Sequence, residues 1–321
     1  MQYQNNRLQR EQKKFIIRVE MVRGMPMEVL KTKTIMTRSN QGNRWFGIDY
    51  HMNLYKGCPF GCIYCDSRCE TYRIDNFDEV RIKENSLEIL EEELKSKGFK
   101  GVVSFGTLSD PYNPEEEKLK LTRQALELIR DYGFGVSMDT KSDLILRDLD
   151  ILKEIARNNS VIIKISITTY DDQLSKKIEP NVINSTKRFA VLKTLRENGI
   201  YAGVLMTPVL PFLTDNEDNI LNMVKKSKEA DAKFIYTKMG MTLRTNQREY
   251  YYNALDVLYP GLKEDYKAVY GNKHICNTLQ FRHLMELFLK SCSENHILTD
   301  MDAIIKDYKK IVPQNEQMSL F

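Results

Sequence analysis

The sequence lacks a long apolar run: nowhere in its 321 residues are there the ~18 consecutive apolar side chains that a membrane-spanning helix needs. The stretch from Met1 to Lys14 is rich in Gln, Asn and Arg and lacks the apolar segment of a signal peptide. The composition also avoids the disordered and collagen-like extremes, since 42% of the residues are hydrophobic and 29% are charged. These absences predict a cytoplasmic protein with a sizeable core and no membrane partner.

Acidic residues are scarce at the start of the chain. Residues 1–45 hold ten Lys or Arg and only three Glu, a net charge of +7, which leaves the rest of the chain at −3. Clustered cations favour an anionic partner, DNA above all, because binding releases phosphate counterions. A solvated extension without a partner is the alternative. We therefore expect a basic N-terminal extension over residues 1–45.

Histidines at metal-ligand spacing are also absent, whereas cysteines are clustered. Four of the six cysteines fall within twelve residues: Cys58, Cys62, Cys65 and Cys69. In a cytoplasmic chain such a cluster favours metal binding or catalysis over disulfides. Cys276 and Cys292 stand apart in helical patterns, and we predict that both are buried as small hydrophobic residues.

Short β-rich runs alternate with helical patterns along most of the chain. The predicted strands lie just before Cys58 and at residues 101–105, 134–139, 161–168, 201–207 and 233–237. The predicted helices are residues 86–97, 115–131, 143–158, 185–198 and 216–230. This order gives six βα units and predicts a parallel sheet with right-handed crossovers.

Six units are fewer than the eight of a closed TIM barrel. A curved, partly closed (β/α)6 sheet and an open doubly wound sheet both fit the pattern. We predict an α/β fold, a partial (β/α)6 TIM-like barrel over residues 46–240. The β pattern stops near Asn246, so a C-terminal helical region is expected over residues 241–312 and a flexible tail over 313–321. The helices expected there are residues 248–258, 262–269, 278–291 and 301–308.

The chemistry is concentrated in residues 57–65, Gly-Cys-Pro-Phe-Gly-Cys-Ile-Tyr-Cys, a C-x3-C-x2-C motif after the first predicted strand. Three thiolates from one loop suit a soft metal. An ordinary [4Fe–4S] or structural zinc site has four protein ligands, so three cysteines leave one metal position open. The alternative is that Cys69 completes a structural zinc site.

The loop also follows the carboxyl end of a strand, where the functional loops of α/β barrels emerge. With Tyr64 before its last cysteine, the motif resembles that of the radical S-adenosylmethionine (radical SAM) superfamily. Residues 53–248 look like the group related to spore photoproduct lyase, the DNA-repair-photolyase-like family. The resemblance implies a lyase-like enzyme with a [4Fe–4S] cluster on three cysteines, Cys58, Cys62 and Cys65.

In that family the fourth iron binds SAM, and reductive cleavage of SAM yields a 5′-deoxyadenosyl radical. The resemblance therefore implies hydrogen abstraction from a DNA base or lesion, with an electron donor such as flavodoxin or ferredoxin as a partner. Alternative readings are a radical SAM enzyme acting on RNA, a peptide or a metabolite, and a non-enzymatic, zinc-stabilised nucleic-acid-binding protein.

The resemblance also implies SAM-binding roles for residues that end the later strands. Ser109 and Asp110 resemble a Ser-Asp pair that contacts the methionine amino group. Lys141 would neutralise the methionine carboxylate, Ser166 would reach the ribose or carboxylate, and Tyr64 would lie near the adenine. Ordinary turns and helix caps are the alternative for these polar residues.

One position departs from the family pattern. Spore photoproduct lyase has a cysteine two residues before its Ser-Asp pair, which returns a hydrogen atom to the substrate radical, and this chain has Thr107 there. The O–H bond of threonine is too strong for that role. Either the radical is regenerated differently or the substrate is not spore photoproduct. Cys69 is the nearest other thiol and is our candidate hydrogen donor, with buried packing as its alternative.

The C-terminus closely resembles the Q-L-S/D-L-F peptide by which bacterial proteins dock on the DNA sliding clamp. An apolar Leu-Phe pair on a polar tail is expected to fill a pocket, either on a partner or on the parent fold. The predicted clamp contacts are Gln317, Met318, Leu320 and Phe321.

Cations and aromatic residues also mix beyond the last predicted barrel strand. Arg244 and Arg248 come shortly before three tyrosines at residues 250–252. This composition is suited to pairing phosphates and stacking bases. The alternative is the core and rim of one helix.

Overall fold

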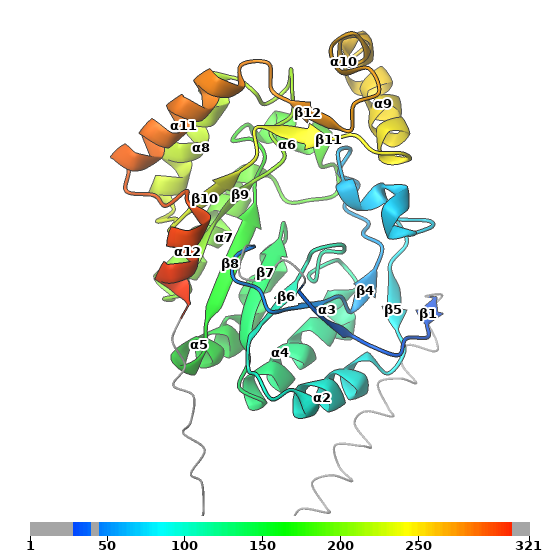
Figure 1. The fold of residues 1–321 in the computed structure, drawn as a ribbon, viewed down its shortest axis with the longest axis vertical. Helices are drawn as coiled ribbons and strands as arrows, with labels where there is room; N and C mark the ends of the chain where they lie inside the picture. The colour runs from blue at the N-terminus through cyan, green and yellow to red at the C-terminus, as the bar shows by residue number, and fades with distance from the viewer. Residues whose placement is uncertain (1–27, 40–44, 310–321) are drawn as a thin grey trace, which may run out of the picture.

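A seven-stranded sheet forms the centre of the computed structural model, which describes residues 28–39 and 45–309 (Figure 1). Its strand order is β10-β9-β8-β7-β6-β3-β2, and all neighbours pair in parallel except β2 and β3. Within the described residues no strand joins β10 to β2, so the fold is a partial (β/α)6 barrel. The strands are β2 (Met36–Arg38), β3 (Tyr50–Met52), β6 (Val102–Phe105), β7 (Gly135–Thr140), β8 (Val161–Ser166), β9 (Ala202–Met206) and β10 (Ile235–Thr237).

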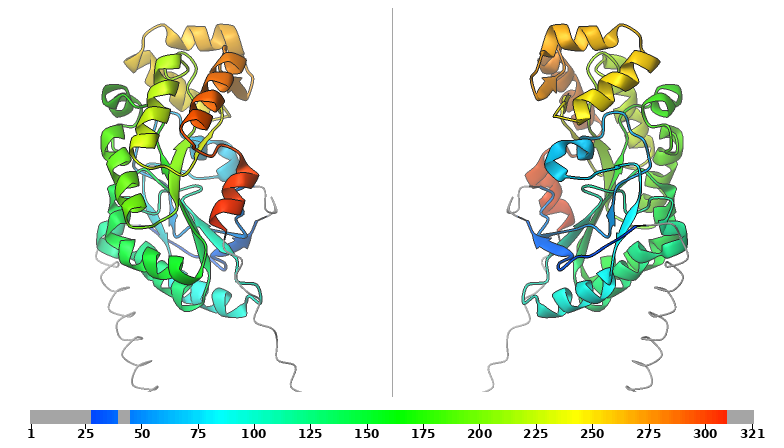
Figure 2. Two further views of the ribbon diagram at one scale, coloured as in Figure 1. Left: turned by 90° about the vertical axis from the view of Figure 1, so that its left-hand side faces the viewer. Right: turned by 90° about the vertical axis from the view of Figure 1, so that its right-hand side faces the viewer.

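Helices connect the parallel strands and cover one face of the sheet (Figures 1 and 2). They are α2 (Ser86–Ser96), α3 (Glu116–Leu119), α4 (Leu121–Asp131), α5 (Leu149–Asn158), α6 (Asp172–Ile178), α7 (Ser185–Glu197) and α8 (Glu217–Glu229). Local sequence explains their beginnings, since the side chains of Asp171, Asn184 and Asn216 each accept a backbone N–H at the start of α6, α7 and α8.

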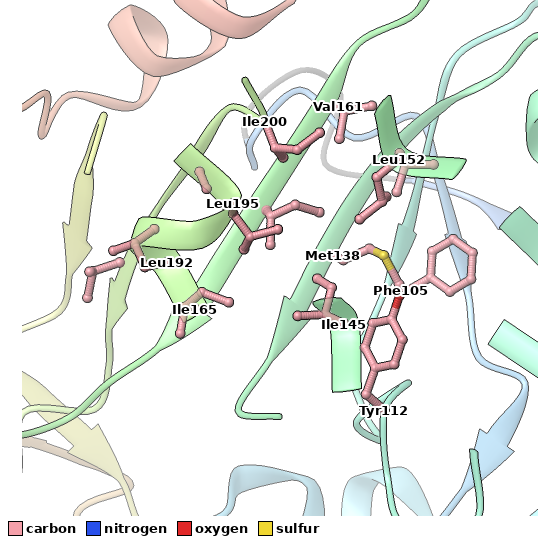
Figure 3. Close-up of a cluster of buried hydrophobic side chains, with 14 of the residues drawn as sticks. Phe105, Tyr112, Met138, Ile145, Leu152, Val161, Ile165, Leu192, Leu195 and Ile200 are labelled. Atoms are coloured by element: carbon pink, nitrogen blue, oxygen red, sulfur yellow. The ribbon is translucent and has the colours of Figure 1, made fainter. Parts of the chain in front are cut away.

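The main core lies between this helical layer and the sheet. Strands β6, β8 and β9 are buried along their whole length, as expected for parallel strands covered on both faces. Met138 of β7 and Ile165 of β8 point toward the helices, where they pack with residues such as Leu152 and Leu195 (Figure 3). Alternate residues of the same strands therefore face the barrel lumen.

A second, smaller core closes the lower end of the lumen. Helix α12 (Met301–Tyr308) lies on the face opposite to α7 and α8 (Figure 2). Its Ile304 and Tyr308 pack with Phe46, Ile162 and Phe234. The lumen is thus plugged with apolar side chains at the amino ends of the strands and faces the functional loops at the carboxyl ends.

The remaining elements surround the carboxyl-end edge or extend the fold. A small sheet contains β1 (Val29–Leu30), β4 (Tyr55–Lys56) and β5 (Arg81–Lys83), and a two-stranded ribbon contains β11 (Gly240–Thr242) and β12 (Ile275–Asn277). The C-terminal helices before α12 are α9 (Gln247–Leu258), α10 (Leu262–Tyr270) and α11 (Phe281–Glu294). Short 3-10 helices are η2 (Asp66–Arg68), η3 (Glu70–Tyr72) and η4 (Asp143–Asp148).

The predicted alternation of strands and helices is confirmed, but several elements differ from the prediction. The helix expected over residues 143–158 begins as the 3-10 helix η4 and becomes α-helical only at Leu149. The prediction that β structure ends near Asn246 is wrong, because the three residues of β12 become a strand only by pairing with β11. The single strand expected before Cys58 is two strands, β3 and β4, that belong to different sheets. The helix expected over residues 115–131 is divided at Lys120, whose φ of 53° interrupts it.

Two smaller outcomes complete the comparison. Helix α6 has no counterpart among the predicted helices, since it is only seven residues long. Cys276 and Cys292 are buried, as predicted. Among the helices of the described residues, none has the length and apolarity required to cross a bilayer.

Candidate active site

The cysteine loop leaves β4 at the carboxyl-end edge of the sheet. Gly57 has a φ of +88°, and a Cβ there would meet the carbonyl oxygen of Glu79 at 2.1 Å, so only glycine fits this tight approach. The backbone N–H of Cys58 donates to the carbonyl of Phe77 (2.7 Å), and that of Ile63 donates to the carbonyl of Ile178 (3.0 Å). The segment just before β5 and the last residue of helix α6 therefore hold the loop in place.

The three cysteines of the motif lie close enough to influence one another electrostatically. Burial raises the pKa of Cys58 to about 12, and the nearby Asp110 carboxylate adds to the shift. Burial also raises the pKa of Cys62 and Cys65, and in both cases Lys141 opposes the rise. As thiolates these groups need a cationic partner in this apolar setting, and iron would provide it.

The zinc alternative required Cys69 as a fourth ligand. Cys69 is buried in the loop between η2 and η3, beside the side chains of Arg244 and Tyr72. Within residues 28–39 and 45–309, no three His, Cys, Asp or Glu side chains converge as around a single ion. A [4Fe–4S] cluster binds each cysteine on a separate iron and so does not require convergence on one point.

A buried ionic network supports the loop from below. The hydroxyl of Tyr64 donates to Glu179, which also pairs with the guanidinium of Arg188. Arg188 further donates to Ser175 Oγ and to the carbonyl of Ser166, both at 2.7 Å. Burial acts to raise the pKa of Glu179, but Arg188 and Lys141 outweigh it, so this pKa is lowered and the carboxylate is charged. Neither Glu179 nor Arg188 belonged to the predicted site, because only the tertiary fold brings them beneath Tyr64.

The predicted SAM-binding residues line the same edge as the cysteine loop. Asp110 Oδ1 accepts from Thr140 Oγ1 (2.8 Å) and Oδ2 accepts from the N–H of Lys141 (2.9 Å), so Asp110 joins the ends of β6 and β7. Burial acts to raise the pKa of Asp110, and these hydrogen bonds only partly oppose it. The buried Oγ of Ser109 has no hydrogen-bond partner in the described part of the chain.

Lys141 is the cation of this edge. Burial acts to lower its pKa, but Cys62 and Glu179 outweigh that effect, so the ammonium is charged. Its Nζ lies 5.9 Å from the ring centre of Tyr64. Ser166 ends β8 and is buried. The three thiols at this edge fit an iron–sulfur cluster. The Lys141 ammonium and the Ser109 hydroxyl, which has no partner in the described part of the chain, fit a ligand that carries a carboxylate.

The C-terminal elements hold the outer side of the loop, which the sequence did not indicate. Buried Gln247 of α9 donates from Nε2 to the carbonyl of Tyr64 at 3.0 Å. Arg248 donates to the carbonyls of Leu243 (2.7 Å), Lys273 (2.6 Å) and Gly271 (3.0 Å). Arg248 therefore has a structural role, since its donors are already used within the protein.

Other predicted residues have different outcomes. Arg244 remains partly exposed, with 39% of its side chain accessible, and its Nε lies 3.9 Å from Asp66. Tyr251 and Tyr252 are buried in the core around α9, as in the alternative of a helix core and rim. The predicted clamp contacts Gln317, Met318, Leu320 and Phe321, like most of the basic extension, lie outside the described residues.

Comparisons with known proteins identify the class. The radical SAM superfamily model matches residues 52–224, more than half of the chain, and the chain belongs to this superfamily. It is an enzyme that uses a [4Fe–4S] cluster and SAM, and the fold and the loop geometry agree with that assignment. When bound, these cofactors supply a 5′-deoxyadenosyl radical for hydrogen abstraction.

Individual relatives are similar over part of their length. An uncharacterized protein of Methanocaldococcus jannaschii is 38% identical over 174 residues, 53% of this chain and 64% of that protein. A protein of Pseudomonas phage M6 named radical SAM Nalpha-GlyT isomerase is 24% identical over 163 residues, 50% of this chain and 33% of that protein. The chain thus spans less than two thirds of these relatives.

Solved structures support the fold. Spore photoproduct lyase complexed with dinucleoside spore photoproduct superimposes with a TM-score of 0.62 and 15% identity, covering 83% of this chain and 78% of that chain. At this identity the match establishes the shared architecture.

In this architecture the chain's own residues have separable tasks. Cys58, Cys62 and Cys65 would hold the cluster. Lys141 would hold the methionine carboxylate of SAM, and Ser109 would contact its amino group. Asp110 orients the end of β7 that carries Lys141. The Tyr64–Glu179 contact keeps the loop packed over the barrel and excludes water from beneath it.

Proposed function

We propose that this radical SAM enzyme abstracts a hydrogen atom from a base or base lesion in DNA, in a repair or modification reaction. The architecture shared with spore photoproduct lyase supports this substrate class, as does the +7 charge of residues 1–45. The phage relative, whose printed name describes an isomerase, widens the reaction class beyond cleavage of one lesion.

The observation that carries the proposal is the charge of the ribbon beside the cysteine loop. Residues 238–248 and 271–282, which include β11 and β12, contain no Asp or Glu. They expose three cations, Lys238, Lys273 and Arg282, as well as the apolar side chains of Ile275 and Phe281. Cations interleaved with apolar and aromatic groups are typical of surfaces that pair phosphates and stack bases.

The ribbon also borders the site directly. Thr242 Oγ1 donates to Asp66 Oδ1 (2.8 Å), and the N–H of Glu70 donates to the carbonyl of Thr245 (3.3 Å). A nucleic acid held by the ribbon would therefore lie next to the loop that carries the three cysteines. Arg244, on the same ribbon, is a further candidate phosphate contact.

The first experiment measures 5′-deoxyadenosine formation by the anaerobically reconstituted, reduced protein. We expect DNA, and ultraviolet-damaged DNA in particular, to stimulate SAM cleavage, with a Cys62→Ala variant silent. Stimulation by RNA or a peptide instead of DNA would transfer the activity to that substrate and contradict the proposal.

A second experiment tests the ribbon. The double variant Lys273→Glu/Arg282→Glu should bind a fluorescent single-stranded oligonucleotide at least ~10-fold more weakly at low salt, because two phosphate contacts are lost. The matched control is Lys153→Glu/Lys228→Glu, which reverses two cations on the outer helices α5 and α8. Equal losses in both variants would show that the ribbon has no special role.

Three partner and residue assignments belong to the same proposal. The electron would come from a low-potential carrier such as flavodoxin or ferredoxin, and Cys69 would return the final hydrogen atom. The tail would dock on the DNA sliding clamp through Leu320 and Phe321. A pull-down with purified clamp should lose its signal in the Leu320→Ala/Phe321→Ala variant.

A further inference from the structure

The barrel lumen contains a group of buried polar residues that the SAM site does not use. Strand register places Asp139 of β7 opposite Lys164 of β8, and His51 of β3 in line with Ser104 and Ser137. All of them alternate with residues that face the helical core, so they point into the lumen. We call His51, Ser137, Asp139 and Lys164 the lumen cluster.

The cluster is built around a fully buried ammonium. Lys164 Nζ lies 2.5 Å from Asp139 Oδ1, 2.7 Å from Ser137 Oγ and 4.7 Å from the ring centre of Phe46. The Lys164 side chain has no exposed surface, whereas 16% of the Asp139 side chain is exposed. Asp139 is therefore the member of the pair that solvent or a ligand can reach.

The cluster also retains unused hydrogen-bonding capacity. The buried Oδ1 of Asp139 has no hydrogen-bond partner among the described residues besides its ion pair with Lys164, and the buried Nδ1 of His51 has no partner there. Burial, helped by Lys164, lowers the pKa of His51, so its imidazole is neutral at pH 7. Buried polar atoms of this kind are normally satisfied, which points to a ligand.

The position of the cluster connects it to the reaction. Asp139 of β7 precedes Lys141, the first residue after that strand, by two positions, and Lys164 precedes Ser166 by two on β8. Two strand residues rise by about 7 Å, so the cluster lies one layer beneath the SAM-binding edge. The apolar plug of Phe46 and Ile162 closes the lumen below it. A group that reaches Asp139 must therefore enter from the side of the site.

The charges identify the class of that group. Lys164 and Asp139 cancel, and His51 is neutral, so the cluster has no excess positive charge for a phosphate. A carboxylate oxygen and an imidazole nitrogen instead match a neutral edge with an N–H donor beside an acceptor, as on every nucleobase.

We infer that Asp139 and His51 bind the hydrogen-bonding edge of the substrate base inside the lumen, and that Lys164 is a positioning residue that holds the Asp139 side chain in its orientation. The inference rests on the proposed DNA substrate and specifies which part of it enters the barrel. The base enters the lumen, and the phosphates stay outside on the ribbon.

The test separates base binding from phosphate binding in the full chain. Fluorescence anisotropy would compare a single-stranded 12-mer that holds all four bases with an abasic 12-mer of the same length. Asp139→Asn should weaken binding of the base-containing probe about tenfold and leave the abasic probe unchanged. An equal effect on both probes, or on neither, would overturn the inference.

A second variant keeps the test valid if a lone uncompensated lysine disturbs folding. Asp139→Asn/Lys164→Met removes the charge pair and should also lose the base-dependent affinity, whereas a purely structural pair predicts that this affinity is retained. Asp148→Asn is the control, because Asp148 is likewise an ion-paired aspartate but is fully buried and faces Arg147 on the helical side. Both of its affinities should be those of the wild type.

The same data distinguish the two levels of the argument. If the wild-type protein binds neither probe, the proposed DNA substrate fails, and the inference fails with it. If both probes bind equally well to the wild type, DNA binding stands but the base does not occupy the lumen.

Discussion

Replacing Glu179 with glutamine should destabilise the protein and loosen the cysteine loop. Glu179 and Arg188 have side chains only 0% and 1% exposed, and Glu179 also accepts the hydrogen bond of Tyr64. Glu179→Gln leaves the Arg188 charge buried without its counter-ion, a change that typically costs about 3–5 kcal/mol. Because glutamine can still accept one hydrogen bond, we expect about 3 kcal/mol.

Thermal unfolding followed by circular dichroism measures this effect. For a chain of this length about 1 kcal/mol lowers Tm by about 2 °C, so the expected decrease is about 6 °C. The lowered pKa of Glu179 fixes the sign of the pH dependence. The stabilisation is complete above the ordinary carboxyl pKa and is lost as the pH falls through the folded value, so wild type and variant should converge in acid.

Two further variants test the reasoning. The double variant Glu179→Leu/Arg188→Met should lose less stability than Glu179→Gln alone, because it leaves no unpaired charge. Asp256→Asn, which breaks the exposed ion pair with Lys263, should leave Tm unchanged. A Tm for Glu179→Gln within about 1 °C of the wild type would refute the idea that the buried pair supports the loop.

The remaining predictions concern the cluster, SAM and one carboxylate. Cys62→Ala should abolish the iron–sulfur absorbance near ~400 nm after reconstitution, whereas Cys292→Ala, in the helical core, should keep it. Lys141→Met should weaken SAM binding about tenfold in calorimetry, because a charged hydrogen bond is worth about 1.5–3 kcal/mol; an unchanged affinity would contradict the assignment. Burial raises the pKa of Asp215 to about 6, so its folded form binds a proton first and the protein gains stability as the pH falls from 7 to 5. Since Asp215 is only half-buried, we expect about 1 kcal/mol, measured by urea unfolding, and Asp215→Asn should remove this pH dependence.

Local sequence determined the order of the strands and helices and the positions of the candidate site residues along the chain. An apolar run such as residues 161–166 or a periodic helix such as residues 185–197 can be predicted from its own residues, because each element has its own apolar face to bury. The spacing of Cys58, Cys62 and Cys65 and the positions of Asp110 and Lys141 after their strands depend only on the chain and on the rule that parallel strands end at one edge. These features therefore identified the superfamily and predicted most of the residues of its site.

Tertiary structure alone decided which distant residues support that site. Glu179 and Arg188 lie beyond β8 and come beneath Tyr64 only when α6 and α7 pack back on the sheet. Asp139 and Lys164 became a pair because β7 and β8 are in register, which a single strand cannot specify. Pairing also created β12, since a three-residue strand has too few residues for a periodic pattern. Buried charges depend on their neighbours in space for their stability, and those neighbours exist only after the chain has folded.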